Sequence, residues 1–322
     1  MKSSNIIRTV LGDIAPPSLG RLDYHEHFFQ RSPLLPDDVL SDEALSGQEA
    51  LRLRNAGVDA TIEATPAGLG RDVEATARIS SSSGLHIVHV TGAHHSGHYP
   101  LDYPLLKFSI DQLAERFIND VTLGFQIPSA QEARTDSGIP IRAGMVKAGI
   151  RYWSINAFEM RVLKAVSLTQ LATGCPVMIH LEYGSASHEI LDILAEHGVP
   201  ANRVVLAHID RNLDPELHVS LAEKGAYLGY DGMARHRESP DSAILQCLRS
   251  VVDAGQSERI VIGGDVARSS RYRSYGGLPG LEYLPLRFLP RLLATVGDDA
   301  YHRIVVTNGV ELLAMPPDKP SS

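Results

Sequence analysis

Side chains that commonly bind divalent metal ions stand near the ends of several short apolar segments of this sequence. Five are of this kind and a lysine occupies the same type of position: His25, His27, His180, His208, Asp265 and Lys147. His25 and His27 are separated by one residue, and alternate side chains of a β-strand point to the same face, so the pair could chelate one ion while Glu26 points away. Such a pair alone is more often structural or exposed. Four imidazoles and a carboxylate together suit zinc or a similar borderline divalent ion, and we therefore predict a metal site.

Lys147 does not fit this site as an ordinary ammonium, because two neighbouring cations would repel it. Reaction of its amine with carbon dioxide would give a carbamate, whose two oxygens could bridge two metal ions. The alternative is a lysine at a strand end that pairs with a carboxylate. Spacing alone favours that alternative.

The apolar segments alternate with stretches of helical spacing, so the repeating unit is a strand followed by a helix. The predicted strands cover residues 21–25, 59–65, 86–92, 144–148, 176–180, 203–208, 226–230 and 259–264. The clearest predicted helices cover residues 158–173, 185–197, 215–224 and 241–254, and each ends near a glycine. Eight such units predict a single (β/α)8 TIM barrel domain over residues 1–322, with a doubly wound open sheet as the alternative. Barrel enzymes carry their reactive groups where the strands end, which is where the six side chains stand.

Two long connections interrupt this rhythm. Residues 94–140 include one predicted helix, 111–122, and the rest is expected to be loop over the barrel mouth or against another subunit. A homodimer built through this loop is a hypothesis. Residues 268–279 are rich in Arg, Tyr and Gly, and a loop after a barrel strand usually shapes the substrate pocket.

The composition excludes some classes of partner. Thirty basic and 38 acidic residues give a net charge of −8 without a long Lys/Arg run, which argues against nucleic acid as the main partner. The first residues lack the apolar stretch of a signal peptide, and no run of about 18 apolar residues predicts a membrane span. We therefore expect a soluble, cytoplasmic protein with no membrane partner. Cys175 and Cys247 are far apart, and we expect them to be buried, reduced thiols.

A set of motifs, taken in order, resembles the phosphotriesterase family of the amidohydrolase superfamily. The motifs are HEH at 25–27, ATPAGLGRDVEATARIS at 64–80, RAGMVKAG at 142–149, PVMIHLE at 176–182, VVLAHIDRN at 204–212 and GGDVAR at 263–268. The resemblance runs from about residue 23 to 313. It implies that His25, His27 and Asp265 hold the more buried of two divalent metal ions, zinc being the first choice. It further implies that His180 and His208 hold the other ion and that carboxylated Lys147 bridges the two.

Such a site implies a hydrolase in which a metal-bridging hydroxide attacks an ester, while Asp265 takes the proton and passes it to the leaving group. GGDVAR followed by Tyr275-Gly276-Gly277 resembles the lactonase branch, which includes enzymes for phosphorylated sugar lactones. We therefore predict a small-molecule lactone as substrate.

Candidate substrate contacts come from the loops. Three arginines could bind phosphate or carboxylate, although loop arginines often simply face solvent: Arg235, Arg268 and Arg271. Two differences from those lactonases weaken the interpretation that these arginines bind phosphate. The lactonases read Arg-Arg-Ser-Tyr in the stretch where this chain has Ser269 and Ser270, and they have a lysine where this chain has Arg235. His94 and Tyr275 are further candidates, and Asp210 with Arg211 could support the metals or form a surface ion pair.

Several other functions stay open on the sequence. The same site permits a phosphotriesterase of the aryldialkylphosphatase type or another carboxylic ester hydrolase. A mononuclear amidohydrolase would leave Lys147 with a structural role only. A non-catalytic metal-binding barrel is a further alternative, against which the full set of ligands argues.

Overall fold

Eight parallel strands form the centre of the protein in a computed structural model that describes residues 5–127, 131–235 and 239–318. In chain order they are β3 Leu22–Glu26, β4 Ala60–Glu63, β5 His86–Gly92, β6 Met145–Ile150, β7 Val177–Leu181, β8 Val204–Ala207, β9 Tyr227–Tyr230 and β10 Ile260–Ile262. Each strand pairs with the next one along the chain. The N–H of Asp265, just past β10, donates to the carbonyl of His25 in β3 at 2.8 Å, so the sheet is a nearly closed barrel. The predicted (β/α)8 TIM barrel is confirmed, and the open sheet is wrong.

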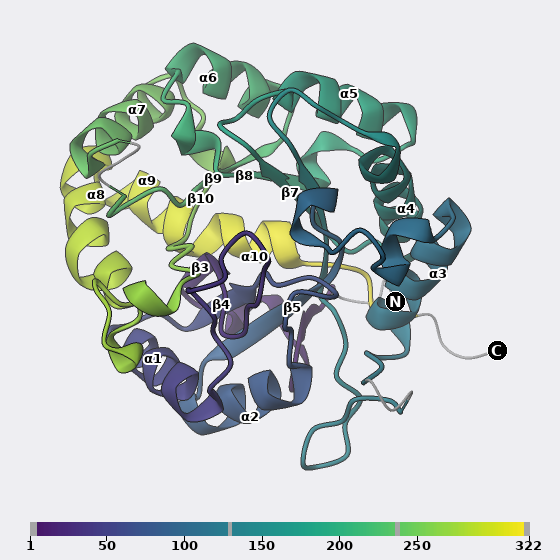
Figure 1. The fold of residues 1–322 in the computed structure, drawn as a ribbon. Helices are drawn as coiled ribbons and strands as arrows, with labels where there is room; N and C mark the ends of the chain where they lie inside the picture. The colour runs from purple at the N-terminus through teal and green to yellow at the C-terminus, as the bar shows by residue number, and fades with distance from the viewer. Residues whose placement is uncertain (1–4, 128–130, 236–238, 319–322) are drawn as a thin grey trace.

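Helices surround the strands as an outer ring (Figure 1). The ring is formed by α1 Glu43–Asn55, α2 Val73–Ser83, α3 Ile110–Thr122, α4 Ala157–Thr173, α5 Ser187–Glu196, α6 Pro215–Glu223, α7 Asp241–Asp253 and α8 Leu289–Val296. Two short helices follow near the C-terminus, α9 Asp298–His302 and α10 Asn308–Leu313, and α10 passes across one end of the barrel. In α4 the Asn156 side chain accepts the N–H groups of Phe158 and Glu159, while Gly174 ends the helix in the left-handed conformation. Among the described residues, no helix is long and apolar enough to cross a bilayer.

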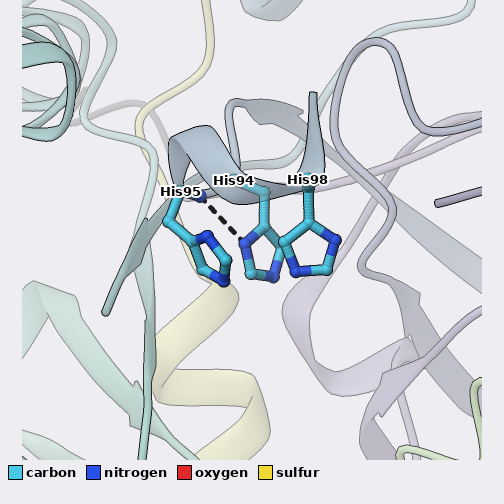
Figure 2. Close-up of side chains that lie close together, drawn as sticks. All are labelled: His94, His95 and His98. Carbon is cyan, nitrogen blue, oxygen red and sulfur yellow. Dashed lines mark hydrogen bonds between the residues drawn. The ribbon is translucent and has the colours of Figure 1, made fainter. Parts of the chain in front are cut away.

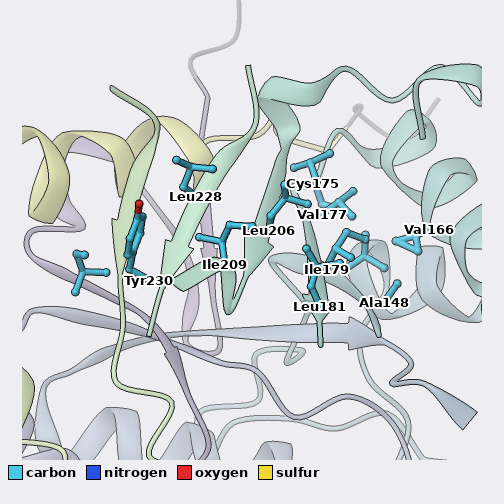
Figure 3. Close-up of a cluster of buried hydrophobic side chains, with 14 of the residues drawn as sticks. Ala148, Val166, Cys175, Val177, Ile179, Leu181, Leu206, Ile209, Leu228 and Tyr230 are labelled. Atoms are coloured by element: carbon cyan, nitrogen blue, oxygen red, sulfur yellow. The ribbon is translucent and has the colours of Figure 1, made fainter. Parts of the chain in front are cut away.

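The hydrophobic core has two layers because alternate residues of each strand face opposite sides. Val205 and Ala207 of β8 pack inside the barrel, whereas Leu206 packs outside. Figure 3 shows part of the outer layer, where residues of β7, β8 and β9 meet the surrounding helices. On β6 the same alternation places Lys147 two residues after the inward Met145, so its side chain lies inside the barrel near the carboxyl end. Cys175 and Cys247 are both buried and free, as expected.

A two-stranded antiparallel hairpin, β1 Ile7–Thr9 and β2 Gly12–Ile14, packs with α10 against the amino-terminal end of the barrel. Ile7, Leu312 and Leu313 are buried in the inner layer there. This hairpin was missing from the expected elements, because its two strands, Ile-Arg-Thr and Gly-Asp-Ile, do not form apolar runs. Since this end is plugged by apolar side chains, the site lies at the other end, where the polar strand ends meet.

Candidate active site

Three of the predicted ligands converge at the junction of the first and last barrel strands. His25 Nε2 lies 3.8 Å and His27 Nε2 lies 3.6 Å from Asp265 Oδ1. Two ligands that share a zinc ion at about 2.1 Å sit roughly 3.4 Å apart, so the spacing leaves room for one ion. His25 Nε2 is buried and has no hydrogen-bond partner among the described residues. A buried imidazole nitrogen in that situation is costly unless it serves as a ligand, and the three residues therefore fit a metal ion.

Because β10 approaches β3 closely, Gly263 must be a glycine. A Cβ on Gly263 would lie 2.8 Å from the backbone nitrogen of His25. Glu26 points away from the ligands and accepts the N–H of Val266 at 3.0 Å. The Gly-Gly-Asp sequence thus allows the chain after β10 to bring Asp265 next to the two histidines.

The remaining predicted ligands, Lys147, His180 and His208, line the same pocket. The rings of His180 and His208 have centroids 4.6 Å apart. Burial lowers the pKa of both imidazoles, and that of His27, well below the ordinary histidine value, so these rings are neutral, as metal ligands must be. Burial also lowers the pKa of Lys147 to about 8, and its Nζ donates to the carbonyl of Ala64 at 2.8 Å.

Asp231, which we did not identify from the sequence, orients two of the predicted ligand histidines. It follows β9 directly, and its carboxylate oxygens lie 3.1 Å from His25 Nδ1 and 2.6 Å from His208 Nδ1. Tyr24 Oη donates a further hydrogen bond to it. A carboxylate that accepts the Nδ1 proton leaves Nε2 as the ligand atom and fixes the ring. Its place immediately after the seventh barrel strand was a signal that could have marked it.

Arginines hold the other oxygen of Asp265. Arg235 Nη2 lies 2.5 Å and Arg211 Nη2 lies 3.1 Å from Asp265 Oδ2. Burial by itself raises the pKa of Asp265, but the charge of Arg235 and of the neighbouring histidines outweighs burial and holds that pKa below its ordinary value. Arg211 is therefore a pocket residue and not part of a surface ion pair.

Of the predicted substrate contacts, Arg268 and His94 line this pocket, whereas Arg271 and Tyr275 lie outside it. Arg271 borders a separate, small cavity with Met233 and Tyr283. The hydroxyl of Tyr275 donates to the carbonyl of Asp42 at 3.0 Å, next to α1. The reason is local: the loop after β10 folds into two short 3-10 turns, which direct these side chains away from the barrel mouth.

The pocket has a volume of about 410 Å³, which suits a small molecule. It adjoins a cavity of about 750 Å³, because Tyr183 and Arg211 line both. Tyr152 and Trp153, from the loop after β6, form an aromatic wall of that second cavity. Sequence reasoning did not identify this wall.

Comparison with known proteins gives a consistent result over the whole chain. A family model described as the Phosphotriesterase family matches residues 5–313. A phospho-furanose lactonase of Mycoplasmopsis synoviae is 27% identical, with 95% of this chain and 91% of the relative aligned. The human N-acetyltaurine hydrolase is 25% identical, with 95% of this chain and 97% of that protein aligned. Among solved structures, a lactonase from Listeria monocytogenes is 29% identical with a TM-score of 0.86, over 96% of this chain and 98% of that one.

Proposed function

Because this chain belongs to the phosphotriesterase family and is a hydrolase acting on ester or lactone bonds, we propose that it opens a lactone that carries an anionic group. The observation that carries the proposal is the convergence of His25, His27 and Asp265 in one pocket with Lys147, His180 and His208. Relatives named lactonases support this choice of ester.

In this proposal two divalent metal ions, with zinc as the first choice, would occupy the site. His25, His27 and Asp265 would hold one ion, and His180 and His208 would hold the other. The Lys147 amine would add to carbon dioxide, forming a nitrogen–carbon bond and releasing one proton, and the resulting carbamate would help to hold both ions. When bound, such ions acidify water and polarise an ester carbonyl.

Asp265 is the proton carrier in this proposal. It accepts a proton from the attacking water as the water oxygen bonds to the carbonyl carbon, and it returns the proton to the ring oxygen when the carbon–oxygen bond breaks. Arg235 and Arg211 contact Oδ2 and direct Oδ1 toward the ligand histidines. This orientation keeps the carboxylate beside the reacting atoms throughout the reaction.

The anionic group of the substrate is proposed from the charges at the mouth. The chain has a net charge of −8, which repels anions, but Arg211, Arg235 and Arg268 all line the pocket. Guanidinium groups bind phosphate through paired hydrogen bonds. The names of two relatives, a phospho-furanose lactonase and an N-acetyltaurine hydrolase, both imply an anionic substrate. A neutral phosphotriester would gain nothing from these arginines, and we place that activity second.

The test is hydrolysis of a substrate panel by zinc-loaded protein, with Asp265→Asn as the inactive control. The panel holds phosphorylated and unphosphorylated sugar lactones, an acyl-homoserine lactone, N-acetyltaurine and paraoxon. The proposal expects the phosphorylated lactones to have the highest kcat/KM. Faster turnover of N-acetyltaurine would support a pocket for an anionic group but show that the cleaved bond is an amide and not an ester. A higher kcat/KM for paraoxon than for every lactone would contradict the proposal.

A further inference from the structure

Three histidines in one turn after β5 gather at the edge of the pocket: His94, His95 and His98. Figure 2 shows their rings hanging from this turn to the same side, with the ring nitrogens farthest from the backbone directed into the same space. The ring centroids of His94 and His98 lie 3.7 Å apart, and His94 lies 4.3 Å from the ring of His180. The cluster therefore borders the proposed reaction centre.

Hydrogen bonds to Nδ1 determine where the protons of these rings lie. The backbone N–H of His95 donates to His94 Nδ1 at 2.9 Å, and the N–H of Gly97 donates to His95 Nδ1 at 3.2 Å. A neutral imidazole that accepts at Nδ1 carries its proton on Nε2. In agreement, His95 Nε2 lies 3.5 Å from a carboxylate oxygen of Glu182, which can only accept.

His98 follows the same rule through Ser32. The N–H of Leu34 donates to Ser32 Oγ at 3.2 Å, and the hydroxyl lies 2.8 Å from His98 Nδ1. We assign the Ser32 hydroxyl as the donor to Nδ1, which places the proton of the neutral His98 ring on Nε2, and the NMR test below checks this assignment.

The cluster is thus unsuited to a third metal ion, although its nitrogens are close enough for one. A metal ligand needs a lone pair, and in this arrangement each Nε2 holds a hydrogen. His95 directs its hydrogen toward Glu182, while His94 and His98 direct theirs into the pocket. Two neighbouring N–H donors at the edge of a pocket can bind oxygen atoms of a ligand.

We propose that His94 and His98 form a subsite that binds hydroxyl or carbonyl oxygens of the substrate, an inference that rests on the proposed lactone hydrolysis. Each neutral N–H donates to one lone pair, which a hydroxyl or carbonyl oxygen of the substrate provides. The turn follows β5, four strands from β9 in an eight-stranded barrel, so it lies across the mouth from Arg235. The substrate is then a hydroxylated lactone, with its anionic end at the arginines and its hydroxyl groups at the histidines.

The first test compares two substrates with wild-type protein and two variants of His98. His98→Leu removes the donor, and His98→Gln keeps an amide donor of similar reach. For a hydroxylated sugar lactone, we expect His98→Leu to raise KM about tenfold and His98→Gln to recover most of that loss. For an unsubstituted lactone without hydroxyl groups, KM stays unchanged in both variants. An equal rise for both lactones would show a merely structural role and overturn the proposal.

The second test does not depend on turnover. Nitrogen-15 NMR of histidine-labelled protein, assigned with the same variants, reports the tautomer, and we expect a proton on Nε2 of His94 and His98. A proton on Nδ1 of either, or one equivalent of zinc lost on His98→Leu, would overturn the subsite in favour of a metal site. His302→Ala, which removes an exposed histidine, is the matched control. If the panel shows no lactone turnover while the tautomers are as expected, the proposed function fails and the donor arrangement stands.

Discussion

Replacing Asp231 with asparagine should weaken the binding of both proposed metal ions, because this one carboxylate contacts a proposed ligand of each. Its oxygens lie 3.1 Å from His25 Nδ1 and 2.6 Å from His208 Nδ1. An asparagine has one acceptor oxygen in place of two, so at least one ring loses its partner and can rotate or change tautomer. Loss of such an outer partner typically costs ~10 to 100-fold in metal affinity.

The assay is a zinc titration against a chromophoric chelator, with wild type, Asp231→Asn and Asp210→Asn compared. Asp210 is a matched control because it is buried in the same region and accepts the N–H of Gly232 at 2.7 Å instead of a histidine proton. We expect both zinc affinities to fall for Asp231→Asn and to stay within about threefold of wild type for Asp210→Asn. Unchanged affinities in Asp231→Asn would refute the reasoning that this carboxylate orients the ligands.

Four other predictions concern the stability of the fold, its dependence on pH and the effect of removing zinc. Gly263→Ala should displace the Asp265 segment, because the new Cβ would meet the backbone nitrogen of His25, and a lowered melting temperature together with lost activity would show it. Leu206→Ala, in the fully buried outer layer, should lower the free energy of unfolding by about 2 to 5 kcal/mol in urea, with the activity of the folded fraction retained. Burial lowers the pKa of His89 to about 3. As the pH falls from about 6.5 toward 3, the unfolded chain binds a proton on this imidazole before the folded chain does, so the free energy of unfolding should fall. His89→Gln should flatten this pH dependence of the unfolding free energy, measured with urea. Removal of zinc by a chelator should lower the melting temperature, because zinc at 100 times its Kd adds ~2.7 kcal/mol to the free energy of unfolding. An unchanged melting curve would count against a bound ion.

Most of the barrel could be predicted from the sequence because its strands are buried on both faces and read as short apolar runs. Glycines after the helices, such as Gly174 after α4, marked where each strand would follow. The β1–β2 hairpin could not be predicted in this way, since each of its strands has only one apolar residue, Ile7 or Ile14. The equally short β10 was predicted because all three of its residues are apolar.

The candidate ligands were visible because each is a polar residue within or just after an apolar run. The positions of loop side chains were not, because loops have no periodic pattern that fixes a direction. Tyr275 therefore contacts α1 instead of the pocket, and Arg211 contacts Asp265 instead of solvent. Asp231 was overlooked because a single carboxylate after a strand does not reveal that it serves two histidines.

The most direct test of the proposed function is the number of zinc ions per chain, measured alongside lactone turnover as zinc and bicarbonate are added to metal-free protein. The proposed site predicts that turnover of a phosphorylated sugar lactone rises with zinc and reaches its plateau at two equivalents per chain. It also predicts that Asp265→Asn never reaches that rate. Full turnover without metal, or a plateau at one equivalent, would contradict a two-ion site built on these six residues.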